Sequence, residues 1–156
     1  MDGTAEEFRR RATDRYGIDP DVETFPEGTE TAADAAAAVG CDVAQIASSL
    51  VFDADGDLVV VVTSGANRVS EPRLADHVGA DGVSMAAPGR VRDVVGWAVG
   101  GVPPICHDAD LPVYLDSSLL DHDTVWAAAG APTAVFPIAP AELAELADAD
   151  AIAVSE

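Results

Sequence analysis

The sequence predicts an α/β (α+β) domain: a mixed, largely antiparallel β-sheet or open barrel with peripheral helices. A continuous β-branched run at residues 58–63 follows a second extended segment at residues 48–52, as in the central strands of a sheet. Helical and extended segments alternate irregularly along the chain, which favours this arrangement over a doubly wound parallel sheet. The residues are 49% hydrophobic but only 5% aromatic, which indicates an ordered core of Val, Ala, Leu and Ile.

Helices are predicted where a capping residue precedes apolar residues at helical spacing. The segments that meet this condition are residues 4–16, 31–40, 70–79, 88–96 and 140–146. Thr4, Thr31 and Ser70 are the expected N-caps, and glycines end the first four segments. Asp42 is expected to cap one further turn.

Strands are predicted from short alternating or β-branched runs bounded by turn residues. Besides the two central ones they are residues 22–25, 83–85, 111–116, 124–128, 133–138 and 151–154, with turns at residues 26–28 and 117–121. The acidic link at residues 53–57, DADGD, makes the central pair a hairpin. It is not a calcium loop, because positions 6 and 12 of an EF-hand loop would be Leu58 and Ser64 instead of Gly and Glu.

The 156 residues are expected to form a single domain, residues 1–156, since a chain of this length buries enough surface to fold alone. Two cysteines do not make a disulfide framework. The first residues lack the apolar core of a signal peptide, and no stretch approaches the length of a membrane span. We therefore expect a cytoplasmic protein with no membrane association.

Charge is the strongest global signal of the sequence. There are 28 acidic and 8 basic residues, a formal net charge of −20, and every basic residue is an arginine. The acidic residues are spread along the chain, so we predict a halophilic protein whose surface repulsion is screened by molar salt. A localised acidic face for a basic partner is the alternative that the sequence leaves open.

Residues 96–107, GWAVGGVPPICH, form the most restricted loop of the chain. Gly100 and Gly101 can adopt backbone angles closed to other residues and let a ligand approach the main chain. After Val102, Pro103 and Pro104 fix φ and offer no N–H donor. The loop is either the wall of a small-molecule site or a tight turn, and these residues alone leave both open.

Polar residues at two predicted strand ends are further candidates. Asp116 ends an apolar strand before two serines, where a carboxylate either caps a turn or belongs to a site. Ser64, Asn67 and Arg68 follow the central strand, either as a capped turn or as a polar rim.

Other chemistry finds little support in the sequence. Cys106 and His107 are neighbours in the chain, but catalytic Cys/His pairs are adjacent in space and not in sequence. Ser48 and Ser49 have no base nearby in sequence, which argues against a serine nucleophile. The three histidines and two cysteines lack zinc spacing, and the chain has neither G-x-G-x-x-G nor a phosphate loop. We expect no metal and no cofactor.

Five segments in order resemble the YbaK-like family of aminoacyl-tRNA deacylases, which includes the editing domain inserted in bacterial prolyl-tRNA synthetases. They are residues 45–52 (QIASSLVF), 61–68 (VVTSGANR), 100–104 (GGVPP), 111–116 and 125–146. The resemblance implies a mixed sheet or barrel and hydrolysis of the ester that joins a wrongly attached amino acid to tRNA.

The resemblance also implies roles for particular residues. The amides of Gly100 and Gly101 would line the aminoacyl pocket and polarise the ester carbonyl, and Asp116 would help to position the substrate. Water or a substrate group would supply the nucleophile. We expect further substrate contacts from Ser49, Ser64, Gly65, Asn67, Val102 and Pro103.

One departure from the family concerns the catalytic position 48. The family has a lysine there that helps to hold the substrate, whereas this chain has Ser48 and no lysine at all. Arg68 or Arg73 would have to replace it, although a guanidinium is not equivalent to an ammonium. Losing a charge-assisted contact costs roughly 2–3 kcal/mol.

Two hypotheses of different classes follow. The first is a free-standing trans-editing deacylase that acts on the 3′ aminoacyl end of tRNA, with an aminoacyl-tRNA synthetase as a potential partner. The second is a non-catalytic module of the same fold that binds an aminoacyl or nucleotide-like ligand. A hydrolase that uses Cys106 and His107 is a distant third.

Overall fold

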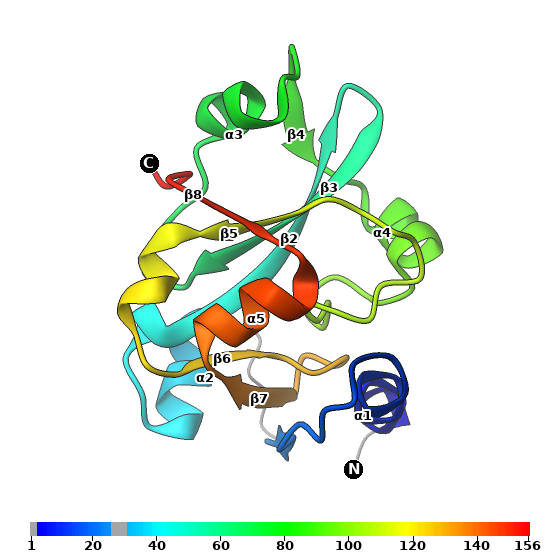
Figure 1. Cartoon of the computed structure of the whole chain (residues 1–156), viewed down its shortest axis with the longest axis vertical. Coiled ribbons are helices and arrows are strands. Elements are labelled where there is room, and N and C mark those ends of the chain that lie inside the picture. The colour runs from blue at the N-terminus through cyan, green and yellow to red at the C-terminus, as the bar shows by residue number, and fades with distance from the viewer. Residues whose placement is uncertain (1–2, 26–30) are drawn as a thin grey trace.

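A computed structural model describes residues 3–25 and 31–156 of the chain. Within them eight strands form one mixed sheet in the order β1-β7-β6-β2-β3-β5-β8, with β4 also paired to β2, and helices surround it (Figure 1). The strands are β1 Glu23–Thr24, β2 Ile46–Ala54, β3 Asp57–Ser64, β4 Val83–Met85, β5 Val113–Asp116, β6 Val125–Ala128, β7 Ala134–Ile138 and β8 Asp150–Ile152. The pairs β1–β7, β6–β7, β2–β3 and β2–β4 are antiparallel, and β2–β6, β3–β5 and β5–β8 are parallel. The predicted fold class is confirmed.

The helices lie where they are predicted. They are α1 Gly3–Tyr16, α2 Ala32–Val39, α3 Glu71–Val78, α4 Pro88–Val95 and α5 Pro140–Ala147, with 3-10 helices at Val43–Gln45 and Ser117–Asp121. Thr31 and Ser70 are N-caps as expected, but Thr4 is not one, because α1 begins at Gly3 and includes it. The Oγ1 of Thr31 accepts a hydrogen bond from Asp34 N over 3.0 Å, and Ser70 caps α3 in the same way. Gly40 ends α2 in the left-handed conformation that glycine adopts without strain.

Several strand boundaries differ from the prediction. The strand predicted at residues 111–116 begins at Val113, after Pro112, which has no N–H for the ladder. The last strand covers residues 150–152 and not 151–154, because its partner β5 ends at Asp116, where a 3-10 helix begins. The turn predicted at residues 26–28 lies outside the described residues.

The acidic turn between β2 and β3 is held by its own carboxylates. Asp53 accepts a hydrogen bond from Gly56 N over 2.7 Å, and Asp55 accepts from the backbone of Asp81 and Gly82 over 2.8 and 3.0 Å. Asp53 therefore stabilises the turn itself, and Asp55 holds the neighbouring loop against it. In the described ranges no three His, Cys, Asp or Glu residues are grouped so that they could hold a metal ion.

The helix α1 packs on the main core through one apolar face. Phe8 is fully buried, and its ring lies 5.0 Å from that of Phe136 and 6.4 Å from that of Trp97. Gly130 makes this approach possible, because a Cβ there would come within 2.8 Å of the Trp97 ring. No helix of the described residues combines the length and the hydropathy that a membrane crossing requires.

The long strand β2 is left uncovered along part of one edge, and this gap positions the site. On that edge β6 pairs with Ile46 and Ala47, and β4 pairs with residues 52–54. The carbonyl of Val51 accepts a hydrogen bond from Ala86 N over 3.0 Å, which extends the β4 pairing by one residue. Residues 48–50 therefore face no strand on this side.

Candidate functional site

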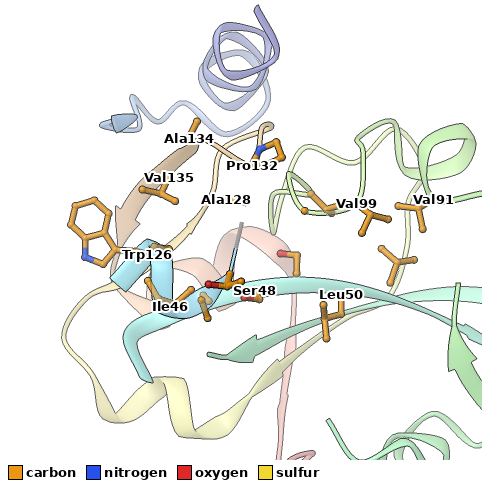
Figure 2. Close-up of a pocket in the computed structure, with 18 of the residues that line it drawn as sticks. Ile46, Ser48, Leu50, Val91, Val99, Trp126, Ala128, Pro132, Ala134 and Val135 are labelled. Carbon is orange, nitrogen blue, oxygen red and sulfur yellow. The ribbon is translucent and has the colours of Figure 1, made fainter. Parts of the chain in front are cut away.

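A pocket of about 500 Å³ opens at the uncovered edge of β2. Its floor is β2 itself, and its walls come from α2, from β6 and β7, from the α4 region and from the glycine loop (Figure 2). In this view Trp126 stands at one end, Val91 and Val99 stand at the other, and Ser48 lies between them. We call the first the indole end and the second the aliphatic end.

The described lining of this pocket contains no ionisable side chain, although the chain carries a net charge of −20. Its side-chain polar groups come from Thr31, Ser48, Ser49 and Trp126, and the remaining lining residues are aliphatic, Met, Gly or Pro. A concave, mostly apolar pocket with a few polar groups is the usual form of a small-ligand site. The lining suits an uncharged group and offers no cation for a phosphate.

The register of the central hairpin directs backbone groups of Ser49 into the gap. Gly65 N donates to Ile46 O over 2.8 Å, which makes this a hydrogen-bonded pair of the ladder. Because such pairs alternate in an antiparallel ladder, Ser48–Thr63 is a hydrogen-bonded pair as well. The N–H and C=O of Ser49 consequently point away from β3, toward the edge that β6 and β4 leave open.

The neighbouring segments give Ser49 few partners. Two residues beyond Ala86, which bonds to Val51, the chain reaches Pro88, which has no N–H and begins α4. In the described part of the chain the Oγ of Ser49 is buried without a hydrogen-bond partner. Ser49 thus brings to the pocket wall polar groups that the sheet does not use.

Four of the predicted site residues line the pocket: Ser48, Ser49, Gly100 and Val102. The other six, Ser64, Gly65, Asn67, Gly101, Pro103 and Asp116, lie outside its lining. Their contacts show what each does in the fold.

Gly65 and Gly101 are sites of close backbone approach. A Cβ on Gly101 would lie 2.8 Å from Ala131 Cα, so the glycine loop can pack on the turn between β6 and β7 only without a side chain there. The N–H of Gly101 donates to Ala98 O over 3.0 Å and is used inside the loop. A Cβ on Gly65 would lie 2.6 Å from that of Ala32 in α2.

Asp116 is the acceptor of a buried polar network at the ends of β3 and β5. It is 1% exposed and accepts hydrogen bonds from Asn67 Nδ2 and Ser118 N, each over 3.0 Å, and from Thr63 Oγ1 over 3.4 Å. Burial alone would raise the pKa of Asp116, but the hydrogen bonds from Asn67 and Ser118 outweigh it and hold the pKa below its ordinary value. The carboxylate is therefore ionised at neutral pH.

This network reaches the pocket floor through one residue. Thr63, which bonds to Asp116, is the partner of Ser48 in the β2–β3 register. Asn67 also donates to Ser118 Oγ over 2.9 Å. Asp116 thus fixes the strand ends behind Ser48 instead of contacting the pocket.

The remaining predicted residues serve local structure. Ser64 Oγ donates to Ala44 O over 2.8 Å, and Pro103 O is hydrogen-bonded to His107 Nε2 over 2.7 Å. Arg73 donates to Ser155 O over 3.0 Å, and Arg68 lies in a groove that adjoins the pocket at Leu50 and Met85. Neither arginine lines the pocket.

The Cys106–His107 pair does not form a catalytic centre. Both residues are buried away from the pocket lining. Burial raises the pKa of the Cys106 thiol to about 11, so it stays protonated and weakly nucleophilic at neutral pH. Burial also lowers the pKa of His107.

The sequence reasoning missed the apolar walls of the pocket, above all Trp126, Val91 and Val99. Trp126 lies in a strand of alternating pattern, which predicts a core residue as readily as a pocket residue at this position. Its only distinguishing signal is that the chain has just two tryptophans.

The comparisons with known proteins agree with this fold. The family model described as "Aminoacyl-tRNA editing domain" matches residues 26–146. A crystal structure described as that of a proposed trans-editing enzyme for prolyl-tRNA synthetase is similar to this chain with a TM-score of 0.95 and 37% identity. That match covers 100% of this chain and 99% of the other.

Two relatives known by sequence complete the comparison. The uncharacterized protein YwhH of Bacillus subtilis is 30% identical over 131 residues, 84% of this chain and 83% of its own. The proline–tRNA ligase of Lysinibacillus sphaericus is 33% identical over 76 residues, which are 49% of this chain but only 13% of the ligase. The chain belongs to the aminoacyl-tRNA editing domain family.

Proposed function

We propose that this protein is a trans-editing deacylase that hydrolyses the ester of a mischarged tRNA. The observation that carries the proposal is the uncharged pocket at the gap in β2, where Ser48, Ser49, Gly100 and Val102 meet in a chain of the editing family. A separate enzyme is supported over a synthetase domain by the 37% identity to a structure described as that of a proposed trans-editing enzyme.

The chemistry of the pocket fits the end of an aminoacyl-tRNA. The terminal nucleoside and its amino acid side chain can be uncharged, and the nearest phosphate lies beyond the ribose. Such a group enters a lining without carboxylates and needs no cation inside the pocket. The anionic remainder of the tRNA stays outside the pocket. Because the 28 acidic residues of the chain repel its phosphates, its approach requires high salt or a partner synthetase. We place this activity in the cytoplasm.

In the proposed reaction, a water molecule attacks the ester carbonyl carbon and gives up a proton, which a neighbouring substrate hydroxyl can relay to the ribose oxygen. The bond from this carbon to the ribose oxygen breaks, and the ribose oxygen takes up a proton as the amino acid leaves. The backbone N–H of Gly100 stabilises the oxyanion. The carbonyl and N–H of Ser49 hold the aminoacyl backbone, and Ser48 Oγ provides a neutral hydrogen bond at the position of the family lysine.

Asp116 is a positioning residue in this scheme. Its hydrogen bond with Thr63 supports the strand that pairs with Ser48. It acts on the pocket through that pairing and does not touch the substrate.

The proposal is tested by deacylation of a panel of mischarged tRNAs, with alanyl- and cysteinyl-tRNA(Pro) foremost, in molar KCl. Ester loss well above the spontaneous rate and proportional to protein concentration is expected for at least one member. Background rates on the whole panel, from protein shown to be folded in that salt, would overturn it.

A binding measurement separates the second hypothesis from the first. A terminal adenosine that carries the amino acid through a non-hydrolysable amide would bind in either case. Binding of this analogue without turnover of any ester would identify a non-catalytic module, in which the change to Ser48 has removed activity.

A further inference from the structure

The two ends of the pocket differ in chemistry. The indole end contains Trp126, beside Ile46 in the β2–β6 register. The aliphatic end contains Val91 and Val99, neither of which has a polar side chain. Ser48 and the edge of β2 lie between them (Figure 2). A ligand whose halves differ would therefore bind in one orientation.

The environment of Trp126 differs from that of the other tryptophan of the chain. Trp97 is 4% exposed, and its indole N–H donates to Cys106 O over 3.0 Å. Trp126 is only half-buried and lines the pocket, and within the described ranges no hydrogen bond to its indole N–H is found. A large aromatic side chain left in a pocket provides a flat surface on which a nucleobase can stack, and such stacking tolerates any base.

The spacing along β2 suits this assignment. Ile46, the register partner of Trp126, is two residues from Ser48, which is about 7 Å along a strand. A ribose placed between them would put its ester at Ser48 and its base at the indole. The amino acid side chain would then extend toward Val91 and Val99, where only apolar groups receive it.

We propose that Trp126 is the stacking platform for the terminal base of the tRNA, and that the aliphatic end holds the side chain of the amino acid. This inference rests on the proposed function, because it assigns the orientation of the substrate in the same pocket. It predicts that changes at the two ends have different effects on kcat/KM. A change at Trp126 alters kcat/KM equally for all aminoacyl-tRNAs, whereas a change at Val99 alters the ratio of kcat/KM between different amino acids.

The first test compares Trp126→Phe with Trp126→Leu. Both variants remove the indole, but only phenylalanine keeps an aromatic face. Stacking on an aromatic residue predicts that Leu lowers kcat/KM about 5- to 150-fold by the same factor for every aminoacyl-tRNA tested, and that Phe recovers much of this loss. Equal losses in Phe and Leu, or no loss in either, from an active wild-type enzyme would overturn the inference and leave the proposed function intact.

The matched variant at the other end is Val99→Phe. Val99 is 53% exposed, so the substitution does not disturb the core. It is expected to reduce deacylation of larger amino acids more than that of alanyl-tRNA. The reverse pattern, with Trp126 setting the preference among amino acids and Val99 acting uniformly, would contradict the proposed orientation.

A fluorescence titration tests the platform without any turnover. In Trp97→Phe, Trp126 is the only tryptophan, so its emission reports on the pocket alone. Saturable quenching by the amide analogue of alanyl-adenosine, and by adenosine itself, is expected. If every tRNA ester proves stable, this titration still decides the inference: saturable quenching supports it, and unchanged emission at millimolar adenosine rejects it.

Discussion

The side-chain amide of Asn67 donates a hydrogen bond to the carboxylate of Asp116 over 3.0 Å and ties the loop after β3 to the end of β5. The same amide donates to Ser118 Oγ over 2.9 Å. Asn67 thus joins two parallel strands at their carboxyl ends, directly behind the floor of the pocket.

Replacing Asp116 with Asn is expected to destabilise the fold. Asparagine keeps one acceptor oxygen but has an NH2 group in place of the other, so either Asn67 Nδ2 or the N–H of Ser118 loses its acceptor, and leaving a buried donor unpaired costs about 1–3 kcal/mol. Urea unfolding in molar KCl measures the difference. Ser118→Ala, which removes only the second acceptor of Asn67, should cost about 0.5–1.5 kcal/mol. An Asp116→Asn protein as stable as the wild type would contradict the assigned role.

The difference in unfolding free energy between the wild type and Asp116→Asn depends on pH with a defined sign. The pKa of Asp116 is lower in the folded protein than its ordinary value of 3.8, so the unfolded state binds more protons as the pH falls. The stability that the carboxylate contributes is full above about pH 4–5 and is lost as the pH falls through the folded value. The unfolding free energies of the wild type and Asp116→Asn, measured between pH 3 and 7, should converge at low pH. A difference between them that widens on acidification would contradict the lowered pKa.

Gly101→Ala is expected to disturb the glycine loop through packing. The new Cβ would lie 2.8 Å from Ala131 Cα, and overpacking of this kind costs about 1–3 kcal/mol. Gly89→Ala in α4 is the matched control, because a Cβ there meets nothing within 4 Å. Thermal unfolding should show a loss for Gly101→Ala and no loss for Gly89→Ala. Equal midpoints for both variants would show that the loop does not depend on this close approach.

Ser48→Lys is expected to raise activity. A lysine at this position would bring a positive charge to a pocket whose described lining has none, and a charge-assisted contact is worth about 1.5–3 kcal/mol. We predict an increase of tenfold or more in kcat/KM for the preferred mischarged tRNA. Ser48→Met has similar length without charge and should not show the increase. Identical rates for the Lys and Met variants would rule out a charge effect at this position.

Local features of the fold could be predicted from the sequence. Thr31 and Ser70 cap their helices through bonds to residues three positions on, and the hairpin follows from a β-branched run and a second extended segment around an Asp/Gly turn. Each of these depends on neighbours in the chain, so the residues that specify them stand together.

The site could be predicted only in part, because its walls depend on contacts between distant segments. Gly100 and Gly101 are adjacent and alike in sequence, yet the first lines the pocket and the second packs on Ala131. Asp116 lies at the expected strand end, but its carboxylate is hydrogen-bonded to Asn67 in the buried network and does not face the pocket. The gap beside Ser49 arises from the parallel pairing of β6 with β2, which no local pattern encodes.

The measurement that tests the proposed activity most directly is the rate of ester hydrolysis of alanyl-tRNA(Pro) in molar KCl, compared between the wild type and Gly100→Ala. Gly100 lines the pocket with a φ of +93°, so a side chain there strains the loop at the point where the proposed reaction places the ester. We predict hydrolysis well above the spontaneous rate in the wild type and a loss of at least tenfold in the variant, with both proteins folded by circular dichroism. Wild-type hydrolysis at the spontaneous rate, or an equal rate in Gly100→Ala, would contradict the assignment of this pocket as the editing site.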